Sequence, residues 1–172
     1  MQIKFEHISA KNLVNFYPSR PLIKENLLQA AKDKENLHCP FLQNIMQIAG
    51  VERCLITSEL LSIVYSADAD FEDVRLSVMA EIDDFATQEG LLESAETTDL
   101  QTACEALADA FIRPTLNRDN GDIEILQVNE QSLELKFTGH CAGCPYAQNT
   151  LQNVIIRTFR KYFPELDIVL KE

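Results

Sequence analysis

Cys141 and Cys144 are the two residues of this sequence whose type and spacing point most directly to chemistry. Gly143 lies between them and permits a tight turn, because it has no side chain to clash, and such a turn lets both sulfurs point to one side. Pro145 follows and suits the first position of a helix. The N-terminal dipole of that helix would favour the thiolate form of Cys144. Thiolates are what both metal binding and disulfide exchange require, so either chemistry is available to the pair.

Three uses of a CxxC pair remain open on spacing alone. Tetrahedral sulfur coordination suits an iron–sulfur cluster and zinc equally well. A thiol–disulfide oxidoreductase of the thioredoxin type also carries CxxC between a strand and a helix, although the βαβ pattern around that motif is missing here. The alternatives to a cluster site are therefore a zinc-bridged dimer with an interaction role and a redox-active dithiol.

The remaining three cysteines and His140 have simpler interpretations. Cys104 lies on the apolar face of a predicted helix and Cys54 alternates with apolar residues in a predicted strand, so both are expected to pack in a core. Cys39 directly follows His38, which is too close for chelation, so packing in a loop is expected. His140 is interpreted as an exposed residue of the turn rather than as a ligand.

Composition places the chain among folded proteins without a membrane segment. Hydrophobic residues make up 46% of the 172 residues, which is ample for a core. No apolar run approaches the roughly 18 residues that span a bilayer. The first residues lack a signal-peptide or transit pattern, so a cytoplasmic, bacterial protein with no membrane partner is expected. Five cysteines without the spacing of a disulfide framework fit a reducing compartment.

Charge and missing motifs exclude two function classes. The formal net charge is −12, from 15 Lys and Arg against 27 Asp and Glu. Such a surface repels phosphate backbones, so nucleic acid is not an expected partner. No set of nucleophile, base and orienting residue is present, nor a phosphate-binding loop, so the chain is not expected to be an enzyme. The acidic residues of the helix after Asp70 are expected to form a solvated face: Glu72, Asp73, Glu81, Asp83 and Asp84.

The apolar pattern predicts an α+β fold of two small domains, each a short sheet covered by helices. The first domain is predicted over residues 1–86, a linker over 87–98 and the second domain over 99–172. Residues 22–37 show no clear pattern. The elements predicted in the first domain are two strands within 1–20, a helix from Pro40 to Gly50, a hairpin over 51–66 and a helix capped by Asp70.

In the second domain, the predicted elements lead straight into and out of the CxxC pair. Thr98 and Gln101 form a capping-box pattern at the start of a helix that could continue, kinked, past Pro114. A hairpin follows, with a turn near Asn129, and its second strand, in which Leu133, Leu135 and Phe137 alternate, ends at the CxxC. The elements predicted after Pro145 are a helix that ends before Pro164 and a last strand over 166–170.

The second half of the chain resembles the C-terminal domain of the Nfu/NifU family of iron–sulfur scaffold and carrier proteins. The resemblance covers nearly all of residues 98–172. Its motifs, in order, are Ile112-Arg113-Pro114, Asp119-Asn120-Gly121-Asp122-Ile123, Gly139-His140-Cys141-Ala142-Gly143-Cys144-Pro145, Thr150-Leu151 and Phe163-Pro164-Glu165. Residues 1–86 resemble the N-terminal domain of many Nfu proteins, through Asn12, Phe16, Gly50-Val51-Glu52-Arg53 and Asp70-Phe71.

The resemblance implies that Cys141 and Cys144 bind a cluster shared between two chains, which is passed to apo iron–sulfur proteins. A 4Fe-4S cluster is expected, with 2Fe-2S as the alternative. Either type usually takes four thiolates, of which one CxxC supplies half, so a homodimer is expected on cluster binding. Upstream cluster-assembly proteins are further expected partners.

Two departures from the family pattern bear on these expectations. Asn120 stands where the family usually has a glycine, but asparagine tolerates a left-handed backbone better than most residues, so the turn is expected to survive. Near the N-terminus, the family's Pro-Asn-Pro-Asn motif is replaced by Ser9-Ala10-Lys11-Asn12, which argues against a partner-docking role for that edge.

Overall fold

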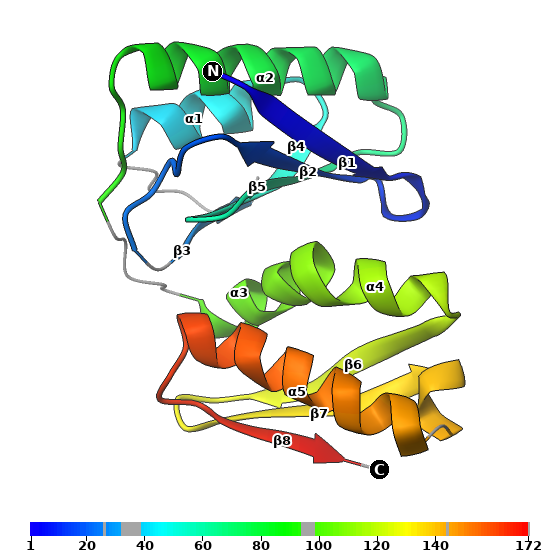
Figure 1. Ribbon diagram of the computed structural model, residues 1–172. Helices are drawn as coiled ribbons and strands as arrows, with labels where there is room; N and C mark the ends of the chain where they lie inside the picture. The colour runs from blue at the N-terminus through cyan, green and yellow to red at the C-terminus, as the bar shows by residue number, and fades with distance from the viewer. Residues whose placement is uncertain (26, 32–38, 94–98, 144, 172) are drawn as a thin grey trace. The chain divides into compact units, whose positions relative to one another are not determined.

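The computed structural model of the chain describes residues 1–25, 27–31, 39–93, 99–143 and 145–171. These form two compact units, Met1–Thr97 and Thr98–Glu172, each with its own sheet and helices (Figure 1). The predicted α+β fold class is confirmed. Among the described helices, none combines the length and apolar content needed to cross a membrane.

The first unit contains a five-stranded sheet in the order β1-β2-β5-β4-β3, in which all neighbours run antiparallel. Both strands expected within residues 1–20 and the hairpin expected over 51–66 are confirmed. Strand β3 lies in the stretch that shows no clear sequence pattern. The strands are β1 (Ile3–Ile8), β2 (Leu13–Pro18), β3 (Leu27–Ala31), β4 (Val51–Thr57) and β5 (Leu61–Tyr65).

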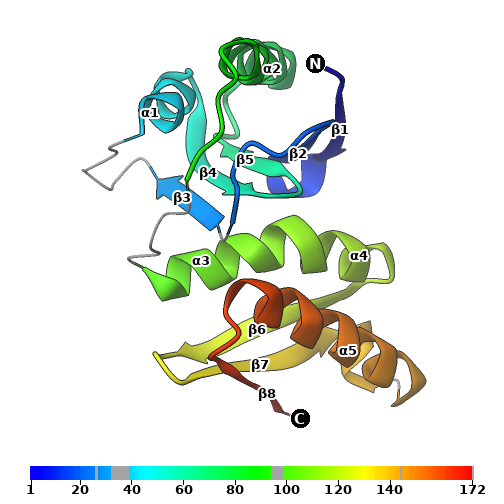
Figure 2. The same cartoon turned by 60° about the vertical axis from the view of Figure 1, so that its left-hand side comes forward.

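Helices α1 (Pro40–Gln47) and α2 (Phe71–Thr87) lie on the same face of this sheet (Figures 1 and 2). The predicted cap of α2 is confirmed, because the carboxylate of Asp70 accepts hydrogen bonds from the amides of Glu72 and Asp73. On the side of α2 that faces the sheet, Val74, Val78 and Ile82 are buried in the core. Helix α1 ends at Gln47, three residues before the glycine that was expected to end it.

The stretch expected to be a linker is partly bound to the first unit. The amide of Leu92 donates to the carbonyl of Leu22, and the carbonyl of Leu92 accepts from the amide of Lys24, at 2.8 and 3.0 Å. These bonds accompany a parallel bridge between Ile23 and Leu92. An apolar residue within the linker sequence thus serves as a short strand partner, while residues 94–98 lie outside the described part of the chain.

The second unit is a three-stranded sheet in the order β6-β7-β8, with its helices on one face (Figures 1 and 2). Strands β6 and β7 form the predicted hairpin, and β8 pairs parallel to β7 after the crossover through α5. Leu133, Leu135 and Phe137 are buried, as their alternation predicts. The elements are α3 (Leu100–Leu107), α4 (Arg113–Arg118), β6 (Gly121–Val128), β7 (Ser132–Gly139), α5 (Pro145–Tyr162) and β8 (Asp167–Lys171).

The cap of α3 differs from the predicted one. The helix begins after Asp99, whose carboxylate accepts hydrogen bonds from the amide and the hydroxyl of Thr102. The capping box was expected to start at Thr98, which lies outside the described residues. Threonine and aspartate can both accept a hydrogen bond from the first turn of a helix, so the sequence alone does not decide which of two adjacent residues is the cap.

Candidate functional site

The CxxC pair lies where the strand β7 gives way to the helix α5. A short 3₁₀ turn, His140–Gly143, connects the two elements and contains Cys141 in its backbone. The predicted order of strand, turn and helix is therefore present. Cys144 lies outside the described residues, and the structure describes only the backbone of Cys141.

The start of this turn is fixed by its close approach to the residues at the start of the neighbouring strand, β6. Gly139 pairs with Gly121 across the strands, and the amide of His140 donates to the carbonyl oxygen of Asn120 at 3.1 Å. Gly139 has a φ of +64°, and a Cβ at this position would lie 2.5 Å from the same carbonyl oxygen. Only glycine therefore fits here without a shift of the backbone.

Asn120 is itself left-handed, with a φ of +55°. This confirms the expectation that asparagine can occupy the position where the family usually has glycine. The residue places its carbonyl oxygen against the start of the CxxC turn. Two left-handed residues, Asn120 and Gly139, thus face each other where the strands β6 and β7 meet the turn.

Arg113, whose side chain is largely buried, joins the helices of the second unit to the start of β6. The guanidinium of Arg113 donates to Glu105 and Asp109 at 2.8 Å each and to Asp122 at 3.2 Å. It also donates to the carbonyl oxygen of Ile123 at 3.2 Å. With its side chain only 11% exposed, Arg113 holds three carboxylates that would otherwise repel one another.

Burial lowers the pKa of the Arg113 guanidinium, but hydrogen bonds to Glu105 and Asp109, together with the charges of these carboxylates, raise it by more. The net pKa is raised, so the cation persists.

The backbone at Arg113 is also unusual. A π-helical segment, Ala108–Ile112, precedes this residue, and the amide of Arg113 donates to the carbonyl of Ala108. This wide turn is how the helix passes Pro114, which has no amide hydrogen to donate.

The role of Arg113 was missed by sequence reasoning, which named it only as part of a family motif. A local signal exists, since Glu105 and Asp109 precede it by eight and four residues, the spacing of one helical face. The partner Asp122 gives no such signal, because it lies beyond a turn on a strand. Asp122 was likewise named only as part of a family motif, and its carboxylate accepts a hydrogen bond from Arg113.

The three cysteines outside the CxxC pair differ in how deeply they are buried. Cys54 and Cys104 are fully buried, as predicted for core residues. Burial and the nearby Cys39 raise the pKa of Cys54, and burial and the nearby Glu105 raise the pKa of Cys104 to about 12. Both thiols are therefore protonated at neutral pH and poor metal ligands. Among the described residues, no group of three or more His, Cys, Asp and Glu could hold a metal ion.

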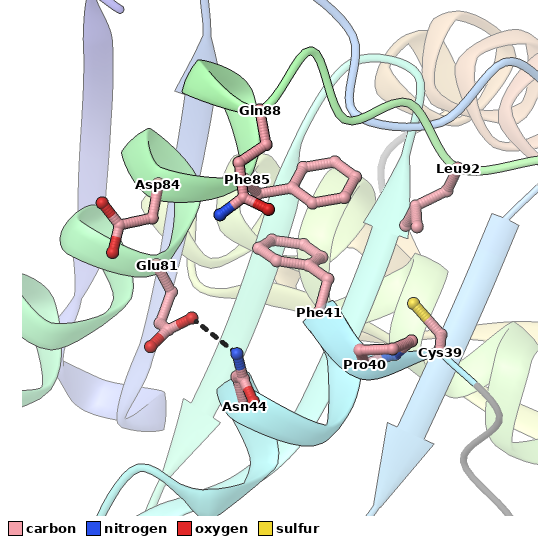
Figure 3. A pocket seen from close by; sticks show the side chains of 9 residues that line it. All are labelled: Cys39, Pro40, Phe41, Asn44, Glu81, Asp84, Phe85, Gln88 and Leu92. Carbon is pink, nitrogen blue, oxygen red and sulfur yellow. Dashed lines mark hydrogen bonds between the residues drawn. The ribbon is translucent and has the colours of Figure 1, made fainter.

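Cys39 lines a cavity of about 320 Å³ between α1 and the end of α2 (Figure 3). The rings of Phe41 and Phe85 stack there at 4.3 Å between centroids, and Asn44 donates to Glu81 at 3.2 Å on the outer side. The thiol is half-buried and precedes the first residue of α1. These are the contacts of two helices packed side by side. The cavity lies in the first unit, whereas the CxxC turn belongs to the second.

Comparison with known proteins connects both units to one family. The family model described as "NifU-like domain" matches residues 105–170, and that described as "Scaffold protein Nfu/NifU N terminal" matches residues 3–89. The NFU1 iron-sulfur cluster scaffold homolog of Homo sapiens, a mitochondrial protein, is 23% identical over 97% of this chain and 70% of its own length. The mitochondrial NifU-like protein 4 of Arabidopsis thaliana is 26% identical over 91% and 61%.

Among solved structures, the NifU-like protein of Saccharomyces cerevisiae is similar to 55% of this chain and 86% of its own length, with 18% identity and a TM-score of 0.49. Of the two sequence relatives, the chain spans 70% of the length of the human protein and 61% of the length of the plant protein. Because both relatives carry mitochondrial names, the expected bacterial, cytoplasmic location stays a prediction.

We predict that Gly139→Ala destabilises the second unit by about 1–3 kcal/mol, because an alanine with a positive φ is strained and its Cβ meets the Asn120 carbonyl. Urea unfolding followed by NMR signals of β6 and β7 would measure the loss. The substitution Asn120→Gly serves as the control and should change stability by less than about 0.5 kcal/mol, since glycine adopts the same backbone. A Gly139→Ala chain as stable as the wild type would contradict the steric argument.

We further predict that Arg113→Met destabilises the second unit by about 2–3 kcal/mol, because it leaves three partly buried carboxylates without their cation. The difference from wild type should narrow in acid, where protonated carboxyl groups no longer repel. The same unfolding measurement at several pH values tests both points. Lys136→Met, which removes an exposed pair with Glu124, is the matched control and should cost about 0.5 kcal/mol or less. Equal losses in the two variants would refute a special role for Arg113.

Proposed function

Because this chain belongs to the Nfu/NifU family of scaffold proteins, we propose that it binds an iron–sulfur cluster through Cys141 and Cys144 and passes the cluster to other proteins. The observation that carries the proposal is the CxxC pair at the junction of β7 and α5, inside the segment that matches the NifU-like domain. The names of the human and plant relatives support an iron–sulfur scaffold role.

The local structure suits two thiolate ligands. Helix α5 begins at Pro145, directly after Cys144, and runs for 18 residues. The positive end of its dipole therefore lies beside the pair and favours thiolates and anionic clusters. On the other side, the contact between Gly139 and Asn120 fixes where the turn leaves the sheet. The donor set, two cysteines in a tight turn at a helix N-terminus, fits one half of a sulfur-ligated cluster.

The other half of the ligand set is proposed to come from a second copy of the chain. Cys54 and Cys104 are buried and protonated, and Cys39 lies in the first unit. A two-fold axis between two copies would place CxxC opposite CxxC and complete four thiolates. A site divided between two chains opens when the chains separate. That property suits a protein for which the cluster is cargo.

In this proposal the cargo is a 4Fe-4S cluster, with 2Fe-2S as the alternative. Upstream assembly proteins supply it and apo iron–sulfur proteins receive it. The chain acts as a carrier rather than an enzyme, since its task is to hold and release the cluster without converting a substrate. We assign cluster binding to the domain predicted over 99–172, and keep 1–86 as the N-terminal domain and 87–98 as the connection.

The proposal predicts that anaerobic reconstitution of the full chain with iron and sulfide gives about two irons per chain in a dimer, because four thiolates are shared between two chains. Cys141→Ser and Cys144→Ser should each abolish this uptake. Iron and sulfide analysis with sedimentation velocity measures both quantities. Cys39→Ser is the control, since a half-buried cysteine of the first unit should leave uptake unchanged.

Other outcomes would favour other functions. Iron and sulfide uptake that survives both substitutions would refute the ligand assignment. Zinc that stays bound without sulfide would favour a zinc-bridged dimer, and turnover of a dithiol substrate would favour an oxidoreductase.

A further inference from the structure

The cavity of the first unit has an apolar side and an acidic side (Figure 3). It lies between the start of α1 and the end of α2, and every residue that lines it belongs to this unit. Cys39, Pro40 and Leu92 line the apolar side, and Glu81 and Asp84 lie on the opposite, acidic side. Its volume of about 320 Å³ is at the lower end of the range found for small-molecule sites. The cavity therefore suits a small ligand with one apolar end and one charged end.

The rings of Phe41 and Phe85 form the wall between these two sides (Figure 3). They stack with 4.3 Å between centroids and 25° between planes. The ring of Phe85 also packs against Gly90, where a Cβ would lie only 2.5 Å from it, so the glycine makes room for the ring. The amide of Gly90 donates to the carbonyl of Phe85 at 3.0 Å. The wall is thus fixed before a ligand arrives, which lowers the entropy lost on binding.

The acidic side places like charges at the wrong end of a helix. Glu81 and Asp84 are three residues apart near the end of α2, where the helix dipole is already negative and where the last turn contains no basic residue. Asp83, next to them, is paired with the N-terminal amine at 2.8 Å. Within the described part of the chain, neither Glu81 nor Asp84 forms an ion pair, although Glu81 accepts a hydrogen bond from Asn44 at 3.2 Å. A cation in the cavity would relieve this repulsion.

We propose that this cavity binds a small organic cation that carries its charge, an ammonium or guanidinium group, on an apolar chain. The charged group lies beside Glu81 and Asp84, and the chain crosses the rings of Phe41 and Phe85 toward Leu92. The faces of these rings also attract cations. None of the lining residues is basic, so an anion would meet carboxylates and no partner of opposite charge. The inference does not depend on the CxxC pair, which belongs to the second unit.

An NMR titration of the cluster-free full chain with hexylamine, at pH 7 and low ionic strength, tests the site. The amine is protonated at this pH. We expect saturable shifts of the amide signals of α1 and of the end of α2. Hexanol, which lacks the charge, and methylamine, which lacks the chain, should each bind about fivefold more weakly or worse. Lysine with both its amino and carboxyl groups blocked distinguishes two sources of the cation. Binding as tight as that of hexylamine assigns the ligand to a side chain of another protein, and weaker binding assigns it to a free amine.

Neutral variants of the acidic side test the role of its charge. Glu81→Gln with Asp84→Asn should weaken hexylamine binding about fivefold or more and leave hexanol binding unchanged. The new amide oxygen at position 81 can still accept the hydrogen bond from Asn44, so the fold is kept. Glu72→Gln with Asp73→Asn is the matched control, because it makes the same charge change in the first turn of the same helix, outside the cavity. It should change the affinity by about twofold or less.

The thiol of Cys39 gives a second readout at the apolar side of the cavity. In a chain with Cys141→Ser and Cys144→Ser, it is the most accessible of the three remaining cysteines, since Cys54 and Cys104 are fully buried. Saturating hexylamine should slow the alkylation of Cys39 by iodoacetamide, and hexanol at the same concentration should slow it less.

Three results would each overturn the proposal. The first is hexanol binding as tight as that of hexylamine. The second is an equal loss of affinity in the Glu81/Asp84 variant and in the Glu72/Asp73 control. The third is alkylation of Cys39 at an unchanged rate when hexylamine is present.

Discussion

The second unit depends on one close backbone contact, that of Gly139 with the carbonyl oxygen of Asn120. Because no side chain fits between them, the end of β7 and the start of β6 are held at a fixed separation. The amide of His140 then bonds to the same oxygen, so the direction of the CxxC turn is set before any ligand arrives. Ligands held in advance lose less conformational entropy on binding, which would favour the cluster site proposed at this turn.

Arg113 stabilises the chain next to that contact through its charge. The guanidinium gathers carboxylates from the helix before Pro114 and from the first residues of β6, directly beside Gly121. Burying a cation is costly, but here three anions and a carbonyl offset the loss of water. Removing the guanidinium would take away the cation that these three carboxylates share. In this acidic chain, Arg113 therefore joins the helices of the second unit to the start of β6, the strand that pairs with the end of β7 before the CxxC turn.

Sequence reasoning succeeded where local physics decides the structure. A capping aspartate, alternation in β7 and a left-handed asparagine each depend on a few neighbouring residues, and all three were predicted. It failed where distant residues decide. Strand β3 is formed through its pairing with β4, and Leu92 is attached to the first unit by Leu22, about seventy residues earlier in the sequence. The reach of Arg113 to Asp122 belongs to the same class, since it crosses from a helix to a strand.

The proposed carrier function places two opposite demands on the chain. A net charge of −12 opposes the approach of two copies, which would favour release, yet the proposed four-thiolate site needs two copies together. In the proposed dimer, the bonds from four thiolates to the cluster would offset that repulsion only while the cluster is bound. In the proposed function, release of the cluster would remove the bonds that join the two copies, and the repulsion between their net negative charges would favour separation.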